Sequence, residues 1–79
     1  MGLYFFNERN GDDYLVDEHG IDLPDLESVR REAVAGARAI VADAVLLGRL
    51  SLRECFEIVD AQGDVVLSLP FSSVIEFDR

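Results

Sequence analysis

The sequence predicts an α+β fold in which a single antiparallel sheet of four strands, or five, packs on one long helix in the order β-β-α-β-β. Two observations lead to this prediction. Apolar residues recur every three or four positions in the middle of the chain, which is typical of an amphipathic helix. Runs rich in aromatic and β-branched residues lie on both sides of that region and are bounded by turn-forming residues. With 79 residues, the chain (1–79) is expected to form one small domain with a small core.

A β-hairpin is predicted near the N-terminus. The run LYFF has a high preference for β-structure, and an Asn-Gly pair, a strong hairpin signal, separates LYFFNER from DDYLVD. We therefore expect strands over residues 3–9 and 13–17. Gly20 then breaks the chain, and Pro24 prevents a strand from continuing.

One long helix is predicted over residues 26–47. The apolar stripe that would face the core consists of Leu26, Val29, Ala33, Ala37, Ile40, Ala44 and Leu47. Gly48 follows the stripe at the position where a left-handed residue ends many helices. Arg30, Arg31 and Arg38 lie away from the centre of the stripe, which indicates a solvated face.

The last third of the chain predicts a second hairpin. CFEIVD (residues 55–60) and DVVLSL (residues 64–69) flank a short loop that contains Gly63. Pro70 ends or kinks the second of these strands. The segment SVIEFD, residues 73–78, would supply the optional fifth strand at an edge of the sheet.

The strands carry more apolar residues than one covered face requires. The alternating positions are Tyr4 and Phe6 against Leu3 and Phe5 in the first strand, and Phe56 and Ile58 against Cys55 and Val59 in the third. One helix covers one face, so apolar residues would remain on the other. Large exposed apolar patches mark interaction sites, which favours a homodimer or another protein partner bound through this strand surface. Ordinary exposed apolar surface is the alternative.

The chain is acidic, with a formal net charge of −9 that is unevenly spread. Residues 7–27 contain eight acidic residues and one Arg, whereas residues 30–53 contain five Arg and two acidic residues. Nucleic acids and anionic membrane surfaces would be repelled overall, so we expect neither as a partner. A lone cysteine and an N-terminus without the pattern of a signal peptide are typical of a cytoplasmic protein.

The segment DEHGIDLPDLESV, residues 17–29, concentrates five carboxylates and the only histidine. It lacks the oxygen ligands that calcium loops need at their third and fifth positions, and one Cys and one His are too few for a zinc site. A helix start explains more of it, because Asp25 can cap the first turn and Glu27 can pair with Arg31. The candidates that remain for a metal or ligand site are Asp17, Glu18, His19 and Asp22. A solvated loop is the simpler interpretation of these four residues.

The sequence contains no catalytic constellation. Cys55 and His19 could act as nucleophile and base only in hydrogen-bond contact, with a third group to orient the base, and no pattern indicates this. The sequence also lacks a phosphate-binding glycine loop, a nucleophile elbow and a paired-cysteine metal motif. We therefore expect a non-catalytic domain without a cofactor.

Three segments that span most of the chain form a specific combination. They are YFF at residues 4–6 followed by Gly11, DEHGIDLPDL at residues 17–26, and FEIVD at residues 56–60 through Gly63 to LPF at residues 69–71. In this order they resemble a family of short domains of unknown function found mainly in rhizobia, methylobacteria and related alphaproteobacteria. The resemblance implies a soluble cytoplasmic bacterial protein and brings no activity, substrate or cofactor with it.

The two strands, the Pro24-Asp25-Leu26 turn and the long helix also resemble the N-terminal domain of HicB-type antitoxins, which bind and cover a small toxin. The Gly-x-Thr approach to the helix in that family is missing, and no DNA-binding module accompanies the pattern. This resemblance implies an alternative function, an antitoxin-like inhibitor whose acidity suits a basic protein partner.

Overall fold

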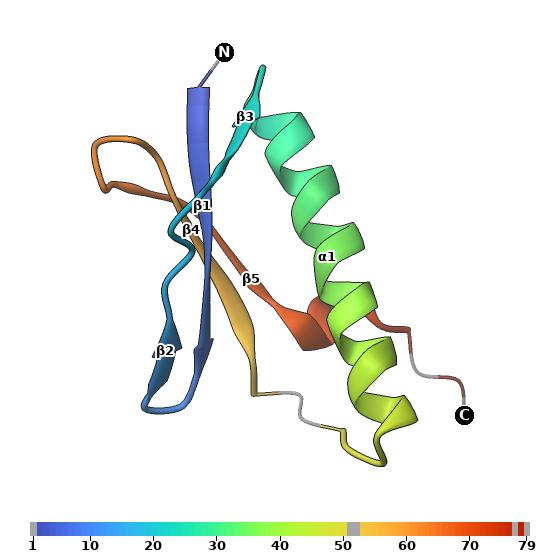
Figure 1. Ribbon diagram of the computed structural model, residues 1–79. Helices are drawn as coiled ribbons and strands as arrows, with labels where there is room; N and C mark the ends of the chain where they lie inside the picture. The colour runs from blue at the N-terminus through green and yellow to red at the C-terminus, as the bar shows by residue number, and fades with distance from the viewer. Residues whose placement is uncertain (1, 51–52, 77, 79) are drawn as a thin grey trace.

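A computed structural model describes residues 2–50, 53–76 and 78 of the protein. One antiparallel sheet of five strands packs against one long helix, which confirms the predicted α+β fold (Figure 1). In chain order the elements are β1 (Gly2–Asn10), β2 (Asp13–Leu15), β3 (Ile21–Leu23), α1 (Leu26–Leu46), β4 (Cys55–Val59), β5 (Val65–Pro70) and the 3-10 helix η1 (Phe71–Val74).

The sheet is built around β1. Along one edge β1 pairs with β4, which in turn pairs with β5. Along its other edge it pairs first with β3, at residues 2–4, and then with β2, at residues 8–10. Both predicted hairpins, β1–β2 and β4–β5, are therefore confirmed, although β2 ends at Leu15 rather than at residue 17.

The fifth strand is β3 and not the C-terminal segment. The sequence analysis places no strand between Gly20 and Pro24, because three residues are too few to show an alternating pattern. The edge strand predicted over residues 73–78 is wrong for the part that the structure describes. There η1 follows β5 directly, and Phe71 and Val74 are buried in the core. Phe77, within that predicted strand, lies outside the described residues.

The helix α1 begins as predicted and ends one residue earlier than predicted. The Oδ1 atom of Asp25 accepts a hydrogen bond from the Ser28 N–H at 2.8 Å, which caps the first turn and lowers the pKa of Asp25. At the other end Gly48 is left-handed, with φ 81°. The N–H groups of Gly48 and Arg49 donate to carbonyl oxygens of the last turn at 2.9 and 2.8 Å, which closes the helix. Within the described residues, no helix has both the length and the apolar character that crossing a membrane requires.

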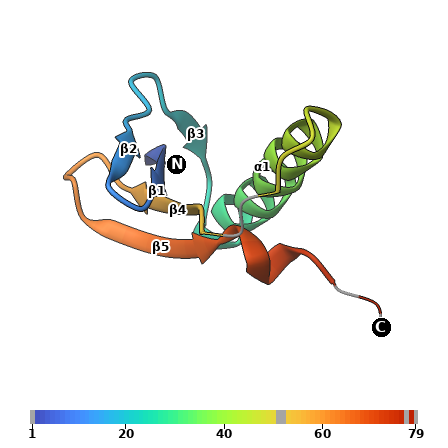
Figure 2. The ribbon, with the colours of Figure 1, turned by 90° about the horizontal axis from the view of Figure 1, so that it is seen from below.

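The core lies between α1 and one face of the sheet, as Figure 2 shows from below. Its buried hydrophobic residues are Val29, Ala33, Ala37, Val41, Phe56, Ile58, Leu69, Phe71 and Val74. The Phe56 ring stands edge-on to the rings of Phe6 and Phe71, with ring centres 5.8 and 4.9 Å away. Phe56 and Ile58 are buried and Tyr4 packs against the core, so of the two sides that the alternation separates, the one with Tyr4, Phe56 and Ile58 faces α1.

Candidate functional site

The acidic loop between β2 and β3 is organised by Asp17. The edge of β1 has no strand partner between its β3 and β2 pairings, and there Asp17 Oδ2 accepts a hydrogen bond from the Phe6 N–H at 3.0 Å. Its Oδ1 atom accepts from the N–H groups of His19 and Gly20, both at 3.1 Å. The carboxylate thus replaces the carbonyl oxygen of a missing strand partner. Sequence reasoning left Asp17 without a structural role, and the structure assigns it one.

The charge of Asp17 makes the stability of the loop depend on pH. Partial burial raises the pKa of Asp17, but the hydrogen bonds from Phe6, Gly20 and His19 outweigh it and hold this pKa below its ordinary value. A carboxyl whose pKa is lower in the folded than in the unfolded chain stabilises the fold above the unfolded pKa, about 3.9. That contribution is lost as the pH falls through the folded pKa.

We expect Asp17→Asn to lower the free energy of unfolding by about 1–2 kcal/mol at neutral pH, because the amide retains only one acceptor for three donors. The variant should also lose less stability than the wild-type protein between neutral pH and about pH 3. Urea unfolding at both pH values measures the two effects. Asp12→Asn, which removes an exposed carboxylate in the β1–β2 turn, is the matched control. A variant that loses stability toward low pH as steeply as the wild type would contradict this role of Asp17.

The other candidates of the loop do not join Asp17 in a site. Glu18 and His19 are exposed, and Asp22 is exposed within β3, opposite Leu3 of β1. Within residues 2–50, 53–76 and 78, no three His, Cys, Asp or Glu side chains lie close enough to hold a metal ion together. Metal binding by the loop stays the alternative to a solvated loop, and calorimetric titration with calcium, zinc and manganese would test it.

The sheet face turned away from α1 is polar over the half nearest the β1–β2 hairpin. Asn7 is buried there, its Nδ2 donates to Tyr14 Oη at 3.0 Å, and its Oδ1 accepts from the Asp17 N–H at 2.8 Å. The Arg9 guanidinium lies 4.6 Å from the centre of the Tyr14 ring and pairs with Glu57, with 3.3 Å between Nε and Oε2. This network is not predicted above, although Asn7 and Arg9 continue the series of Leu3 and Phe5 along one side of β1.

On the other half of the same face, less apolar surface is exposed than the alternation of strand residues predicts. Leu3 and Val65 are exposed there, whereas Phe5 and Val59 are only half-buried. The loop passes over Phe5 at Gly20, where an added Cβ would lie 3.0 Å from the ring. The predicted surplus of apolar strand surface is therefore present but partly covered.

Among the described residues, the two most exposed large apolar side chains, Leu46 and Leu47, lie at the C-terminal end of α1, while Leu15 and Val16 are exposed at the end of β2. We call Val45, Leu46, Leu47 and Leu50 the apolar helix end. Leu46 and Leu47 are 83 and 78 % exposed, and Figures 1 and 2 show the last turn of α1 standing clear of the sheet. The predicted burial of Leu47 is wrong, and so is that of Leu26 at the other end of the stripe.

The reason for both errors is length. A helix of 21 residues extends about 31 Å, whereas β4 and β5, which contact α1, have five and six residues and extend about 17 and 20 Å. The sheet can therefore cover only the middle of the apolar stripe. A comparison of the predicted element lengths would have revealed the overhang from the sequence.

Comparison with known protein families shows to which family the chain belongs. Residues 3–72 match the family described as Domain of unknown function (DUF6894). The chain belongs to this family. The match confirms the resemblance to a family of unknown function. The matched residues of this DUF6894 domain include Asp17, the apolar helix end and Phe71. No curated protein and no solved structure matches the chain.

One more surface of this DUF6894 domain has unusual electrostatics. A hollow beside the β1–β2 hairpin is lined by Glu8, Asn10, Asp13, Tyr14, Leu15 and Glu54. Burial raises the pKa of Glu8, and the negative charge of Glu54 raises it further. The hollow thus holds carboxylates that repel one another.

Proposed function

We propose that this DUF6894 domain is non-catalytic and acts through protein contacts, and that two copies associate through the apolar helix end. The observation that carries the proposal is the exposure of Leu46 and Leu47, side by side in sequence with two further exposed apolar residues. Single exposed leucines are common on protein surfaces, whereas apolar residues gathered at one place are typical of interaction sites.

Energy and charge both favour this surface for self-association. Burying a leucine side chain contributes about 1.5–3 kcal/mol, which matters in a domain with so small a core. The apolar helix end also belongs to the Arg-rich residues 30–53. Two copies that met through residues 7–27 would bring two strongly acidic surfaces together, and contact at the apolar helix end avoids this repulsion.

The surface is mapped by substitutions that keep the helix intact. We expect the double variant Leu46→Gln, Leu47→Gln to weaken self-association at least about tenfold, because it removes two apolar contacts from each copy. Leu26→Gln, at the opposite end of α1 and 55 % exposed, is the matched control and should associate like the wild-type protein. Sedimentation velocity across a concentration series measures both.

A second pair of substitutions tests the apolar strand surface as the interface. Leu3→Thr and Val65→Thr replace the exposed apolar residues of the uncovered face with a residue that favours strands. We expect this double variant to associate like the wild type. If it became monomeric while the Leu46→Gln, Leu47→Gln variant still associated, the interface would lie on the sheet and the proposed surface would be wrong.

The antitoxin-like alternative has one structural observation in its favour. The acidic hollow at Glu8 and Glu54 holds repelling carboxylates, and a Lys or Arg side chain from a basic partner would relieve the repulsion. Purification from the native host tests it. A small basic protein that co-purifies with the wild-type chain and is lost with the double variant Glu8→Gln, Glu54→Gln would support this function, and retention of that protein by the variant would count against it.

A further inference from the structure

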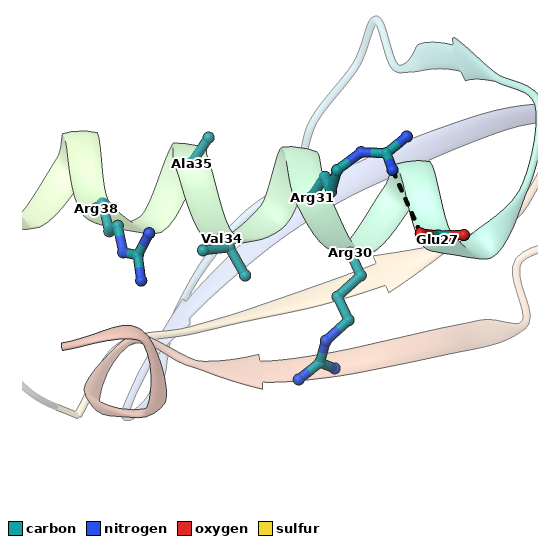
Figure 3. Close-up of a pocket in the computed structure, with 6 residues that line it drawn as sticks. All are labelled: Glu27, Arg30, Arg31, Val34, Ala35 and Arg38. Atoms are coloured by element: carbon teal, nitrogen blue, oxygen red, sulfur yellow. Dashed lines mark hydrogen bonds and ion pairs between the residues drawn. The ribbon is translucent and has the colours of Figure 1, made fainter. Parts of the chain in front are cut away.

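The N-terminal half of α1 contains a positively charged hollow in an otherwise acidic chain. We call it the arginine hollow; it is lined by Glu27, Arg30, Arg31, Val34, Ala35 and Arg38 (Figure 3). Three of the seven cationic residues of the chain meet one carboxylate here, whereas the whole chain has a net charge of −9. The solvated face predicted for these arginines therefore carries a hollow, with Arg30 and Arg38 on one side of it and Arg31 on the other.

One of the three guanidinium groups, that of Arg38, is anchored on another element of the fold, and that of Arg31 has only contacts within its own helix. Arg38 Nε donates to the carbonyl oxygen of Val74 at 3.0 Å, which leaves its two terminal NH₂ groups for a ligand. Arg31 donates to Ser28 Oγ at 3.2 Å and pairs with Glu27 at 3.4 Å. Because Arg38 is already ordered, it loses less conformational entropy when it binds a carboxylate.

Arg30 differs from the other two arginines. Among the residues that the structure describes, Arg30 has no hydrogen-bond or ion-pair partner. Figure 3 shows Arg30 and Arg38 extending to the same side of the helix, with Val34 between them, while Arg31 extends to the other side. The side with Arg30 and Arg38 therefore presents two cations around one apolar residue.

The spacing of these three residues indicates the shape of a ligand. Arg30, Val34 and Arg38 follow one another at intervals of four residues, so the two arginines are about 12 Å apart along the helix axis. In an extended peptide the first and fifth residues are about 13 Å apart on one face, with the third residue between them. Acidic residues at the first and fifth positions of the peptide would lie opposite Arg30 and Arg38. An apolar residue at its third position would lie opposite Val34.

We propose that the arginine hollow binds an extended acidic segment of a partner protein, with the pattern acid-x-apolar-x-acid, whose carboxylates pair with Arg30 and Arg38. Charge complementarity favours this occupant, and carboxylate pairing with Arg can be bidentate and specific in geometry. A second copy is a poorer occupant. Its own segment of this pattern, Asp13 to Asp17, ends in the carboxylate that already accepts three hydrogen bonds within the fold. The site lies on α1 away from the apolar helix end, so it is independent of the proposed self-association.

Fluorescence anisotropy with a labelled synthetic peptide, Gly-Glu-Ser-Leu-Ser-Glu-Gly, tests the proposal on the full chain. We expect saturable binding that weakens with added salt, and binding at least about fivefold weaker for the peptide with both Glu replaced by Gln. A peptide of the same composition with the two Glu adjacent should bind equally poorly, because it cannot reach both arginines. Inorganic phosphate should displace the patterned peptide no better than sodium chloride does at the same ionic strength. Stronger displacement by phosphate would mean that the hollow binds anions in general.

Substitutions in the chain complete the test. Arg30→Gln should weaken binding of the patterned peptide at least about fivefold, and Arg38→Gln should do the same if circular dichroism shows an unchanged fold. Arg49→Gln, outside the hollow, is the matched control and should bind like the wild type. The proposal is overturned if the rearranged peptide binds as well as the patterned one, or if Arg49→Gln weakens binding as much as Arg30→Gln. It is also overturned if Arg30→Gln alters only the sedimentation of the protein alone, since the occupant would then be a second copy.

Discussion

The variant Phe71→Ala is expected to lower the free energy of unfolding by about 3–5 kcal/mol, more than any other single substitution considered for this chain. Phe71 is fully buried, and its ring packs edge-on against Phe56 at the centre of the core. Its backbone N–H also donates to the carbonyl oxygen of Glu54 at 2.9 Å, which ties η1 to the start of β4. A domain of this length has about 4–12 kcal/mol of stability in total, so this loss would be a large part of the whole.

Urea unfolding followed by circular dichroism measures the loss, with two comparisons that isolate its cause. Phe71→Leu keeps more of the side-chain volume and should cost clearly less than Phe71→Ala. Leu46→Ala removes a leucine that is 83 % exposed and should change the stability by no more than about 0.5 kcal/mol. If Phe71→Ala cost less than about 1 kcal/mol, η1 would not be part of the core.

The second large effect is expected for Gly20→Ala, which should cost about 2–3 kcal/mol. Gly20 has φ 74°, a left-handed conformation that costs an alanine about 1–2 kcal/mol. An added Cβ would also lie 3.0 Å from the backbone oxygen of Tyr4 and 3.0 Å from the Phe5 ring. The oxygen belongs to β1 and cannot move without disturbing its pairing with β3.

Gly11→Ala separates the two causes. Gly11 has a similar φ of 62°, but an added Cβ there would meet no atom within 4 Å. Thermal unfolding of both variants should show the greater loss for Gly20→Ala, and the difference measures the close approach of the loop to β1. Equal losses would mean that the loop shifts freely, and the role of Gly20 in holding it against Phe5 would then be wrong.

The elements that the sequence predicts well are those with a local signal. The Asn-Gly pair marks the first hairpin, Asp25 marks the start of α1, and Gly48 marks its end, because each of these residue types satisfies a backbone requirement within a few residues of itself. The separation of Phe56 and Ile58 from Val59 onto opposite sides of β4 also follows from local alternation, but the choice of the side that faces α1 does not.

The elements that the sequence misses depend on contacts between distant segments. β3 is too short to carry a pattern and exists because β1 offers it a free edge. In the sequence, Asp17 cannot be distinguished from the other acidic residues of its loop. Its role depends on the hydrogen bond that it accepts from the Phe6 N–H, eleven residues away. Phe71 follows a proline that ends a strand, and only its packing on Phe56 makes it a core residue. Of the candidate site, the acidic composition of the loop is visible in the sequence, but the arginine hollow is not, because helical spacing alone cannot show a depression.

Self-association through the apolar helix end can be measured on the wild-type protein. The measurement is sedimentation velocity between about 1 and 200 μM, at an ionic strength that screens the net charge of the protein. We predict a weight-average mass that rises with concentration from one copy toward two, and that remains near one copy for Leu46→Gln, Leu47→Gln under the same conditions. A wild-type protein that sediments as a single copy over the whole range would contradict this self-association.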